Sequence, residues 1–256
     1  MSYRIDLNCD LGEGFGNWQM GNDAALLELV TSANIACGFH AGDPATMRRT
    51  AQMAVERGVS IGAHVAYPDL RGFGRRHIEL TKEELFADVL YQIGSLEALT
   101  HSVGGSVAYV KAHGALYNEM MVDADLAQTV VAAIFSHRPT LPLLVLPGSV
   151  AQQVANESEL PTFSEGFADR AYESDGQLVS RQIPGSLLHD PAQVAARALR
   201  MVLEGTVITI DGTELAIEVA SICLHGDTPG AVEISREVRA VLQNAGVELT
   251  PFVATT

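Results

Sequence analysis

Residues 33–58, which read ANIACGFHAGDPATMRRTAQMAVERG, decide the fold. The first seven residues form a short, mostly apolar run of strand character, and His40 follows it directly. Asp43 then supplies a capping side chain in front of Pro44, which needs no N–H at the first helical position, and Gly58 ends the helix. The stretch therefore predicts one complete strand and helix, with a polar side chain where the strand ends.

The same pattern of a short apolar run followed by a capped helix recurs along the chain. Helices are predicted near 22–31, 44–58, 81–103, 123–137, 149–156, 191–205 and 227–246. Strands are predicted over 4–9, 33–39, 59–65, 107–111, 141–146, 162–164 and 215–224. Asp211-Gly212 also predicts a small hairpin turn between 207–210 and 215–219. Strands that alternate with helices predict a parallel sheet.

Seven strand and helix units in 256 residues predict an α/β fold, and more specifically a (β/α)7 barrel that forms a single domain over residues 1–256. An open, doubly wound sheet would give a similar order of elements. Polar residues distinguish the two, because five of them stand at predicted strand ends: Asp10, His40, His64, His113 and His225. A barrel brings these ends to one mouth, whereas an open sheet spreads them along a line.

Composition argues against several classes of partner. The 31 acidic and 16 basic residues give a formal net charge of -15, so the average surface would repel nucleic acid. Only Lys82 and Lys111 are lysines, and neither stands in a phosphate-binding P-loop. No apolar run approaches the roughly 18 residues of a membrane span and no secretory signal is recognisable, which predicts a cytoplasmic protein without a membrane partner. Cys9, Cys37 and Cys223 are widely spaced, which indicates reduced thiols. Cys9 and Cys37 are in phase with apolar side chains and are predicted to pack, whereas Cys223 is in phase with His225, which favours packing but leaves a reactive thiol open.

The first two strands carry polar side chains on the face that a barrel turns inward. Asp6, Asn8 and Asp10 alternate with apolar residues, and Asn34 shares a face with His40. Buried carboxylates and amides need cations, hydrogen-bond donors or a metal as partners. Asp10, at the strand end, is therefore predicted to be functional. Asp6 lies deeper, where a hydrogen-bonded plug is as compatible with the pattern as a functional role.

The strand-end histidines are the richest source of chemistry, because imidazole is the usual general acid or base near neutral pH and the commonest metal ligand. One or two of them could instead hold loops through ring N–H bonds to carbonyl groups. Asp10 with His40 and His64 has the composition of a two-histidine, one-carboxylate site, which leaves a divalent metal open there.

Cationic groups in the sequence could bind an anionic substrate. Burial would lower the pKa of Lys111 and make it a base, or the ammonium could hold a substrate carboxylate; an ion pair with Asp6 or Asp10 is the alternative. Backbone N–H groups of the glycine-rich loop 12–16 could form an anion-binding nest. Bidentate recognition of a carboxylate or phosphate is offered by arginines after the third and sixth strands, Arg75 and Arg170.

Six motifs along the chain carry a family resemblance. They are DLNCDLGE at 6–13, ANIACGFHAGDP at 33–44, YPDLRGFGRR at 67–76, HGALY at 113–117, EGFADR at 165–170 and HGDTP at 225–229. Together they resemble the LamB/YcsF family over essentially the whole chain. The resemblance implies a (β/α)7 barrel similar to those of glycoside hydrolases and polysaccharide deacetylases, in agreement with the order of predicted strands and helices.

The activity that this resemblance implies is ATP-dependent opening of the 5-oxo-L-proline lactam to L-glutamate, performed as the A subunit of a 5-oxoprolinase with partner subunits B and C. Opening a resonance-stabilised amide needs an activated water and a proton for the ring nitrogen. The catalytic candidates are Asp10, His40, His64, Lys111 and His113. The substrate-binding candidates are Asn8, Glu13, Asn34, Arg75, Arg170 and His225.

Two positions depart from the family pattern. Val65 and Ala112 stand where the family usually has proline, beside His64 and His113, which predicts a different loop geometry there. Two other functions also fit the sequence. One is a metal-dependent deacetylase of acylated sugars, and the other is a non-catalytic subunit that binds the lactam.

Overall fold

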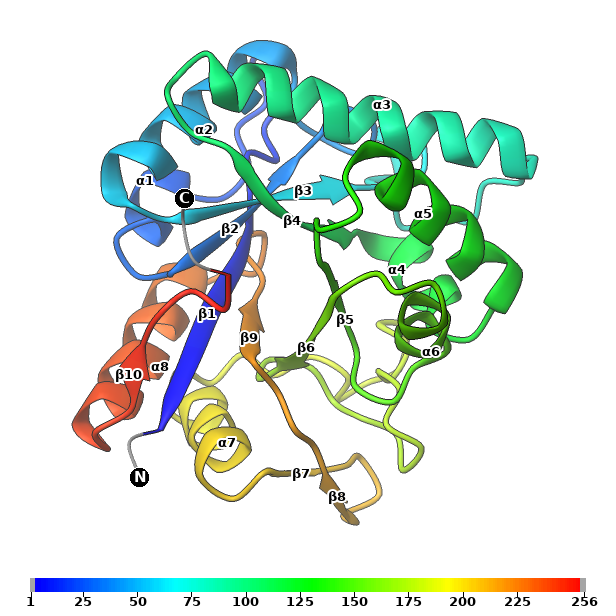
Figure 1. Ribbon diagram of the computed structural model, residues 1–256. Coiled ribbons are helices and arrows are strands. Elements are labelled where there is room, and N and C mark those ends of the chain that lie inside the picture. The colour runs from blue at the N-terminus through cyan, green and yellow to red at the C-terminus, as the bar shows by residue number, and fades with distance from the viewer. Residues whose placement is uncertain (1–2, 254–256) are drawn as a thin grey trace.

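The computed structural model describes residues 3–253, and seven of its strands form a closed parallel barrel (Figure 1). The strands pair in the order β1-β2-β3-β4-β5-β6-β9, and β9 pairs back to β1, which closes the sheet. They are β1 (Arg4–Leu11), β2 (Ser32–Ala36), β3 (Ser60–Val65), β4 (Val107–Ala112), β5 (Leu143–Val145), β6 (Thr162–Phe167) and β9 (Ser221–Leu224). The predicted (β/α)7 barrel is confirmed. The two ends of the predicted 1–256 domain lie outside the described residues.

Helices surround the barrel in Figure 1, and their starts follow the capping signals in the sequence. The Asp43 side chain accepts hydrogen bonds from the N–H groups of Ala45 and Thr46, and a capping box joins Thr81 to Glu84. The helices are α1 (Asp23–Leu26), α2 (Pro44–Arg57), α3 (Lys82–His101), α4 (Gly114–Met120), α5 (Ala124–His137), α6 (Val150–Glu157), α7 (Pro191–Leu203) and α8 (Ala231–Asn244), with a 3-10 turn, η1 (Leu70–Gly72).

Two predicted helices are shorter than expected. The helix predicted over 22–31 covers only Asp23–Leu26, because the chain turns immediately afterwards to enter β2. The helix predicted from Asp227 begins at Ala231 instead. Gly230, with a φ of 80°, takes the left-handed conformation that ends the preceding turn, and the Asp227 carboxylate bonds to Arg75 rather than capping the helix.

Five predicted strands have clearly different limits. The strand over 141–146 covers only Leu143–Val145, and the strand over 4–9 continues to Leu11. The strand over 33–39 ends at Ala36, because Gly38 turns the chain with a φ of 95°. The strand over 162–164 continues to Phe167, which brings Glu165 into the sheet. The stretch 215–224 is two elements: β8 (Glu214–Ala216) pairs with β7 (Thr206–Ile208) as the predicted hairpin, and β9 enters the barrel. The structure adds two elements that the sequence did not predict, α4 and a short strand, β10 (Glu248–Leu249), beside β1.

The space between strands and helices is apolar, whereas the inside of the barrel is polar. Cys9 and Cys37 belong to the apolar layer, as predicted. Asp6 is 1% exposed inside the barrel and accepts hydrogen bonds from Thr31 Oγ1 at 2.5 Å and Ser32 Oγ at 2.6 Å. Asp6 is thus the hydrogen-bonded plug that the sequence left open, and burial raises its pKa to about 6.

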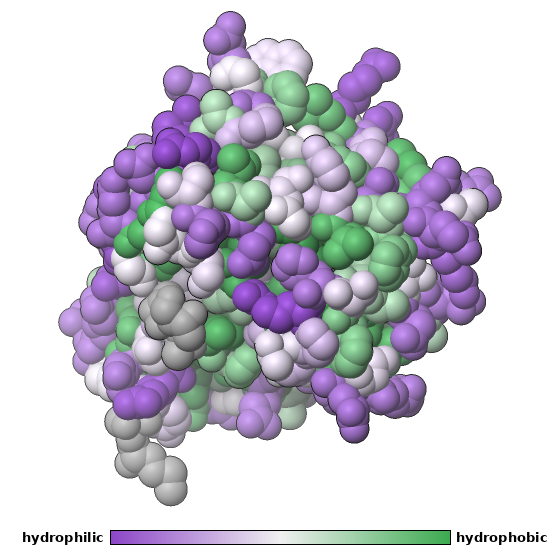
Figure 2. Space-filling view, turned by 45° about the horizontal axis from the view of Figure 1, so that its top comes forward, coloured by the Kyte–Doolittle hydropathy of each residue, from purple (hydrophilic) through white to green (hydrophobic). Residues whose placement is uncertain are grey.

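The surface in Figure 2 is mixed, with hydrophilic side chains projecting around the outline and hydrophobic ones interspersed between them. None of the described helices is long and apolar enough to cross a membrane. The described cysteines are all unpaired and buried.

Candidate active site at the carboxyl end of the barrel

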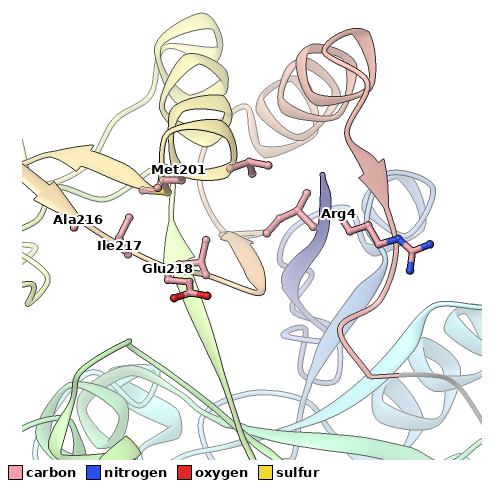
Figure 3. A pocket seen from close by; sticks show the side chains of 9 residues that line it. Arg4, Met201, Ala216, Ile217 and Glu218 are labelled. Atoms are coloured by element: carbon pink, nitrogen blue, oxygen red, sulfur yellow. The ribbon is translucent and has the colours of Figure 1, made fainter. Parts of the chain in front are cut away.

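Two hollows of similar volume open at opposite ends of the barrel. One, of about 520 Å³, lies beside the start of β1 and residues 216–219; Figure 3 shows Met201 and Ile217 around it and the Arg4 guanidinium directed away. The other, of about 500 Å³, lies where the strands end, and several of the predicted site residues line it. Barrel enzymes build their active sites at the carboxyl ends of the strands. The second hollow, called the mouth cavity below, is therefore the candidate active site.

The structure places most of the predicted site residues at the mouth cavity and the rest directly behind it. Those that line the cavity are Asp10, His64, Arg75, Lys111, His113, Arg170 and His225. Four other predicted site residues do not line the mouth cavity and lie behind the residues that do. They are at most 5% exposed: Asn8, Glu13, Asn34 and His40.

Lys111 comes from β4 and is 2% exposed, inside the barrel. Its Nζ lies 2.9 Å from Glu165 Oε2, 3.4 Å from Asp10 Oδ1 and 3.0 Å from Cys223 Sγ. Burial by itself would lower the pKa of Lys111, but Asp10, Cys223 and Glu165 outweigh it and raise that pKa well above its usual range. The prediction of a lysine base with a lowered pKa is therefore wrong, and the alternative ion pair with Asp10 is confirmed.

Asp10 is held in its ionised form by the groups around it. Its Oδ1 accepts a hydrogen bond from Asn34 Nδ2 at 2.8 Å and lies 3.3 Å from His64 Nε2. Burial works to raise the pKa of Asp10, but His64 and Lys111 hold it well below its usual range. Asn34 Nδ2 also donates to Asn8 Oδ1 at 2.7 Å, and the same Asn8 oxygen accepts a hydrogen bond from Lys111 Nζ. The two buried amides therefore connect Asp10 and Lys111 in one hydrogen-bond network.

Three histidines and a glutamate converge beside Asp10. His113 Nδ1 lies 3.0 Å from His64 Nε2, and Glu13 Oε1 lies 3.3 Å from His40 Nε2 and 3.8 Å from His113 Nδ1. Burial and the neighbouring histidines lower the pKa of both His40 and His113 well below the usual range. Burial, with Asp10 and Asp227 adding to it, raises the pKa of Glu13 well above its usual range.

The histidine cluster differs from the metal-binding set expected from the sequence, which was Asp10, His40 and His64. Two groups of described residues could hold a metal ion, and in each the ligand atoms lie within 4.8 Å of one another: Glu13, His40, His64 and His113 form one, and Asp10, Cys223 and His225 form the other. The reason is that β2 ends four residues before His40, so this ring lies next to the loop after β1, which carries Glu13.

Val65 and Ala112, the two departures from the family pattern, pair with each other in the β3–β4 ladder. The N–H of His113 donates to Val65 O at 2.8 Å, directly after that pair. The two positions therefore contribute ordinary sheet pairing next to His64 and His113.

His225 follows β9 and forms a pair with a residue that the sequence did not single out. His225 Nδ1 lies 2.7 Å from Asp169 Oδ2, and both residues are buried. Burial would raise the pKa of Asp169, but His225 lowers it below its usual range. Because Asp169 occupies Nδ1, Nε2 is the ring nitrogen left to exchange a proton with a molecule in the cavity.

Arginines gather on the side of the mouth cavity next to His225. Arg75 pairs with Asp227 at 2.6 Å, while Arg170 donates from Nη2 to Val179 O at 2.7 Å and its buried Nε has no partner among the described residues. Burial and the nearby Arg181 lower the pKa of Arg170 to about 10. Two partly desolvated guanidinium groups, those of Arg170 and Arg181, form a site suited to an anion.

Sequence reasoning missed Glu165 and Asp169 as site residues. Both lie in the EGFADR motif, and each would have been found by extending the sixth strand through Phe167, which turns Glu165 inward and sets Asp169 just beyond the strand end. The nest expected from the glycine-rich loop is occupied by the chain itself, since Gly12 N and Gly16 N donate to the carboxylates of Asp23 and Asp43.

The fold and the cavity define a barrel protein with acid–base groups at the carboxyl ends of its strands, which is the plan of barrel enzymes. The chain belongs to the LamB/YcsF family, whose model matches residues 5–256.

Relatives of known structure or name agree with this assignment. The chain is 54% identical to 5-oxoprolinase A subunit 3 of Pseudomonas syringae pv. tomato, over 97% of each chain. The crystal structure of a lactam utilization protein from Thermus thermophilus superposes with a TM-score of 0.92 at 45% identity, covering 96% of this chain and 99% of that one. A family 4 carbohydrate esterase from Streptomyces lividans shares the fold alone, with a TM-score of 0.52 at 10% identity over 99% of this chain and 96% of the other.

Proposed function

We propose that this chain is the A subunit of an ATP-dependent 5-oxoprolinase, which opens the lactam of 5-oxo-L-proline to L-glutamate with partner subunits B and C. The names of its relatives support the reaction, since they include a subunit of 5-oxoprolinase and a lactam utilization protein. The observation that carries the proposal is the mouth cavity itself. It combines guanidinium groups for an anion with a proton-exchanging histidine, in about 500 Å³, the size of a small-molecule site.

Substrate binding is assigned to the arginine side of the mouth cavity. 5-Oxoproline is a five-membered lactam with one carboxylate, and Arg170 and Arg181 offer it paired guanidinium donors. Phe167 and Leu178 line the same cavity and give the ring carbons an apolar contact. We propose that the amide of the ring then lies toward Lys111, whose positive charge would stabilise negative charge that develops on the carbonyl oxygen.

Proton transfer is assigned to His225 and Asp10. His225 Nδ1 is held by Asp169, so Nε2 can donate a proton to the ring nitrogen as the amide bond breaks. Asp10 stays ionised and lines the cavity, which suits it to accept a proton from the attacking water. His64 and His113 were expected in this role, but their ring nitrogens already face carbonyl groups and one another.

ATP is proposed as the co-substrate of the complete complex. Opening a stable lactam to near completion requires coupling to ATP hydrolysis. Phosphorylation of the amide oxygen by ATP supplies this coupling, because it makes the carbonyl carbon a better electrophile. ADP leaves in that phosphorylation, water then attacks the carbon, and the C–N bond breaks to give a free amino group and an acyl phosphate. A second water hydrolyses the acyl phosphate to glutamate and phosphate. We further propose that subunits B and C complete the ATP-dependent step in the cytoplasm.

The test is ATP-dependent glutamate release from 5-oxoproline by the chain reconstituted with subunits B and C. His225→Gln is expected to lower the turnover number by about 10²-fold or more. His189→Gln, a change at an exposed histidine outside the cavity, is the matched control and should leave turnover unchanged.

Two results would contradict the proposal. A non-catalytic subunit that only binds the lactam would lose affinity in the His225 variant while the turnover of bound substrate stayed the same. A deacetylase of acylated sugars would release acetate from an N-acetylated sugar without ATP and would add nothing to glutamate formation.

A further inference from the structure

The histidine cluster of Glu13, His40, His64 and His113 has a feature that the proposed reaction does not use. All four side chains are at most 5% exposed, and one nitrogen or oxygen of each lies within 4.8 Å of those of the other three. The measured separations between these atoms are 3.0 Å, 3.3 Å and 3.8 Å. Donors about 2.0–2.1 Å from a tetrahedral Zn²⁺ lie about 3.3–3.4 Å apart. These three separations lie within about 0.5 Å of that spacing, and the other separations are at most 4.8 Å, so small side-chain movements would close the cluster around one tetrahedral ion.

The outer nitrogens of two rings fix which inner atoms carry lone pairs. His113 Nε2 lies 2.9 Å from Phe73 O, and His64 Nδ1 lies 3.3 Å from Lys111 O. A carbonyl oxygen only accepts, so each of these nitrogens carries the hydrogen. In neutral rings the remaining nitrogens, His113 Nδ1 and His64 Nε2, both present lone pairs, and these lie 3.0 Å apart. His64 Nε2 also lies 3.3 Å from the Asp10 carboxylate, so either a metal ion or a proton must supply positive charge at this nitrogen. Two such lone pairs repel unless a cation lies between them.

The backbone that supports His113 is built to hold that ring. Phe73 takes a left-handed conformation with a φ of 56°, which is unfavourable for a bulky residue and here directs its carbonyl oxygen at His113. Gly74 follows, and a Cβ on it would lie 2.8 Å from both His113 Cδ2 and His40 Cβ. The rings of His40 and His113 stack with centroids 3.8 Å apart. A carbonyl partner that fixes the ring is the usual support of a metal-bound histidine.

Charge also favours a cation in the cluster. The Glu13 carboxylate has His40 and His113 as its only ion-pair partners among the described residues, and no lysine or arginine of that part of the chain lies within ion-pair distance of it. Lys111 is already shared between Asp10 and Glu165. Because burial favours a proton on Glu13, a bound cation would displace that proton and become the partner of the buried carboxylate.

We propose that Glu13, His40, His64 and His113 bind one divalent transition-metal ion of the Zn²⁺ class. Three imidazole nitrogens and one carboxylate oxygen suit zinc, cobalt or iron rather than magnesium or calcium, which prefer all-oxygen sites. His64 and His113 line the mouth cavity, so an ion can enter from there. The inference is independent of the proposed 5-oxoprolinase reaction. The competing occupant of the gap between His64 and His113 is a proton on one of the two rings.

Metal content of the purified full chain tests this proposal without any activity assay. The protein is expressed with added zinc, purified by ion exchange without chelator, and analysed by mass spectrometry of the elements. We expect about one zinc per chain in the natural sequence, and Co²⁺ in the metal-depleted protein should give the visible absorption bands of a tetrahedral site. His64→Gln and His113→Gln should each weaken Co²⁺ binding by at least about 10-fold.

Control variants keep the test decisive. His77→Gln and His189→Gln change exposed histidines and should keep both the zinc and the cobalt bands. Glu13→Gln conserves shape, so it serves if a histidine variant fails to fold, and it should also weaken Co²⁺ binding. Less than about one tenth of a zinc per chain with no cobalt bands would overturn the proposal and leave the proton as the occupant, and so would equal binding by all variants.

Discussion

Lys111→Met is the most informative single perturbation of the barrel interior. Methionine keeps the length and the apolar stem but removes the ammonium that lies 2.9 Å from Glu165 and 3.4 Å from Asp10. Removing one partner of a buried ion pair destabilises a protein by about 3–5 kcal/mol, because the remaining charge has no compensation. Asp10 keeps His64 and Asn34 as partners, whereas among the described residues the one hydrogen bond left to Glu165 comes from Asn8 Nδ2 at 3.4 Å. Most of the cost should therefore arise at Glu165.

A second substitution locates that cost. Glu165→Gln in the Lys111→Met background removes the unpaired charge and should recover about 1–3 kcal/mol, the coupling expected between contacting groups. Urea unfolding followed by far-UV circular dichroism measures both effects. Fluorescence is less suited to it, since the single tryptophan, Trp18, is 72% exposed in the folded chain. A loss below about 1 kcal/mol in Lys111→Met, or additive losses in the double variant, would refute the buried ion pair as the centre of the site.

Three further predictions concern other parts of the barrel. Burial raises the pKa of Asp6 to about 6, so the protonated carboxyl adds about 3 kcal/mol to the free energy of unfolding below pH 4, and this stabilisation is lost as the pH rises to about 6. In urea titrations across this pH range, Asp6→Asn should show a smaller fall in the free energy of unfolding than the natural chain. An equal fall in both proteins would contradict the prediction. Gly62→Ala would place a Cβ 2.2 Å from the Tyr109 ring and should lower the free energy of unfolding by about 1–3 kcal/mol, measured in urea; an unchanged midpoint would show that the ring moves freely. Asp169→Asn should lower the turnover number of the reconstituted complex by about 10²-fold with little change in thermal stability, and normal turnover would remove His225 from proton transfer.

Local signals in the sequence predicted the fold well because they act over a few residues. Asp43 and Thr81 cap helices through bonds to N–H groups two or three residues away, so the sequence alone contains both partners. Strand limits were predicted less well. Whether the sixth strand ends at Ser164 or Phe167 depends on pairing with β9, some fifty residues later in the chain, which local patterns do not encode.

The predicted site residues were brought together by the barrel, but their surroundings were not predictable. The position of Lys111 near a strand end indicated a charged group in the mouth, but the sign of its pKa shift followed from the combined effect of Asp10, Cys223 and Glu165, which lie on three other strands. In the same way Asp169 could not be assigned to His225 from the sequence, because 56 residues separate them. Contacts of this kind are set by the closing of the barrel rather than by either motif.

Histidines at equivalent strand ends can have different chemical roles. The role depends on which group hydrogen-bonds to one ring nitrogen, because that bond determines what the other ring nitrogen can do. In His113 a backbone carbonyl, that of Phe73, fixes one nitrogen and leaves a lone pair aimed into a buried cluster, which suits a metal ligand. In His225 a carboxylate, that of Asp169, fixes one nitrogen and leaves the other at the cavity, which suits proton transfer. The choice of partner therefore separates a ring nitrogen aimed into the buried histidine cluster from one left free at the cavity, within one mouth.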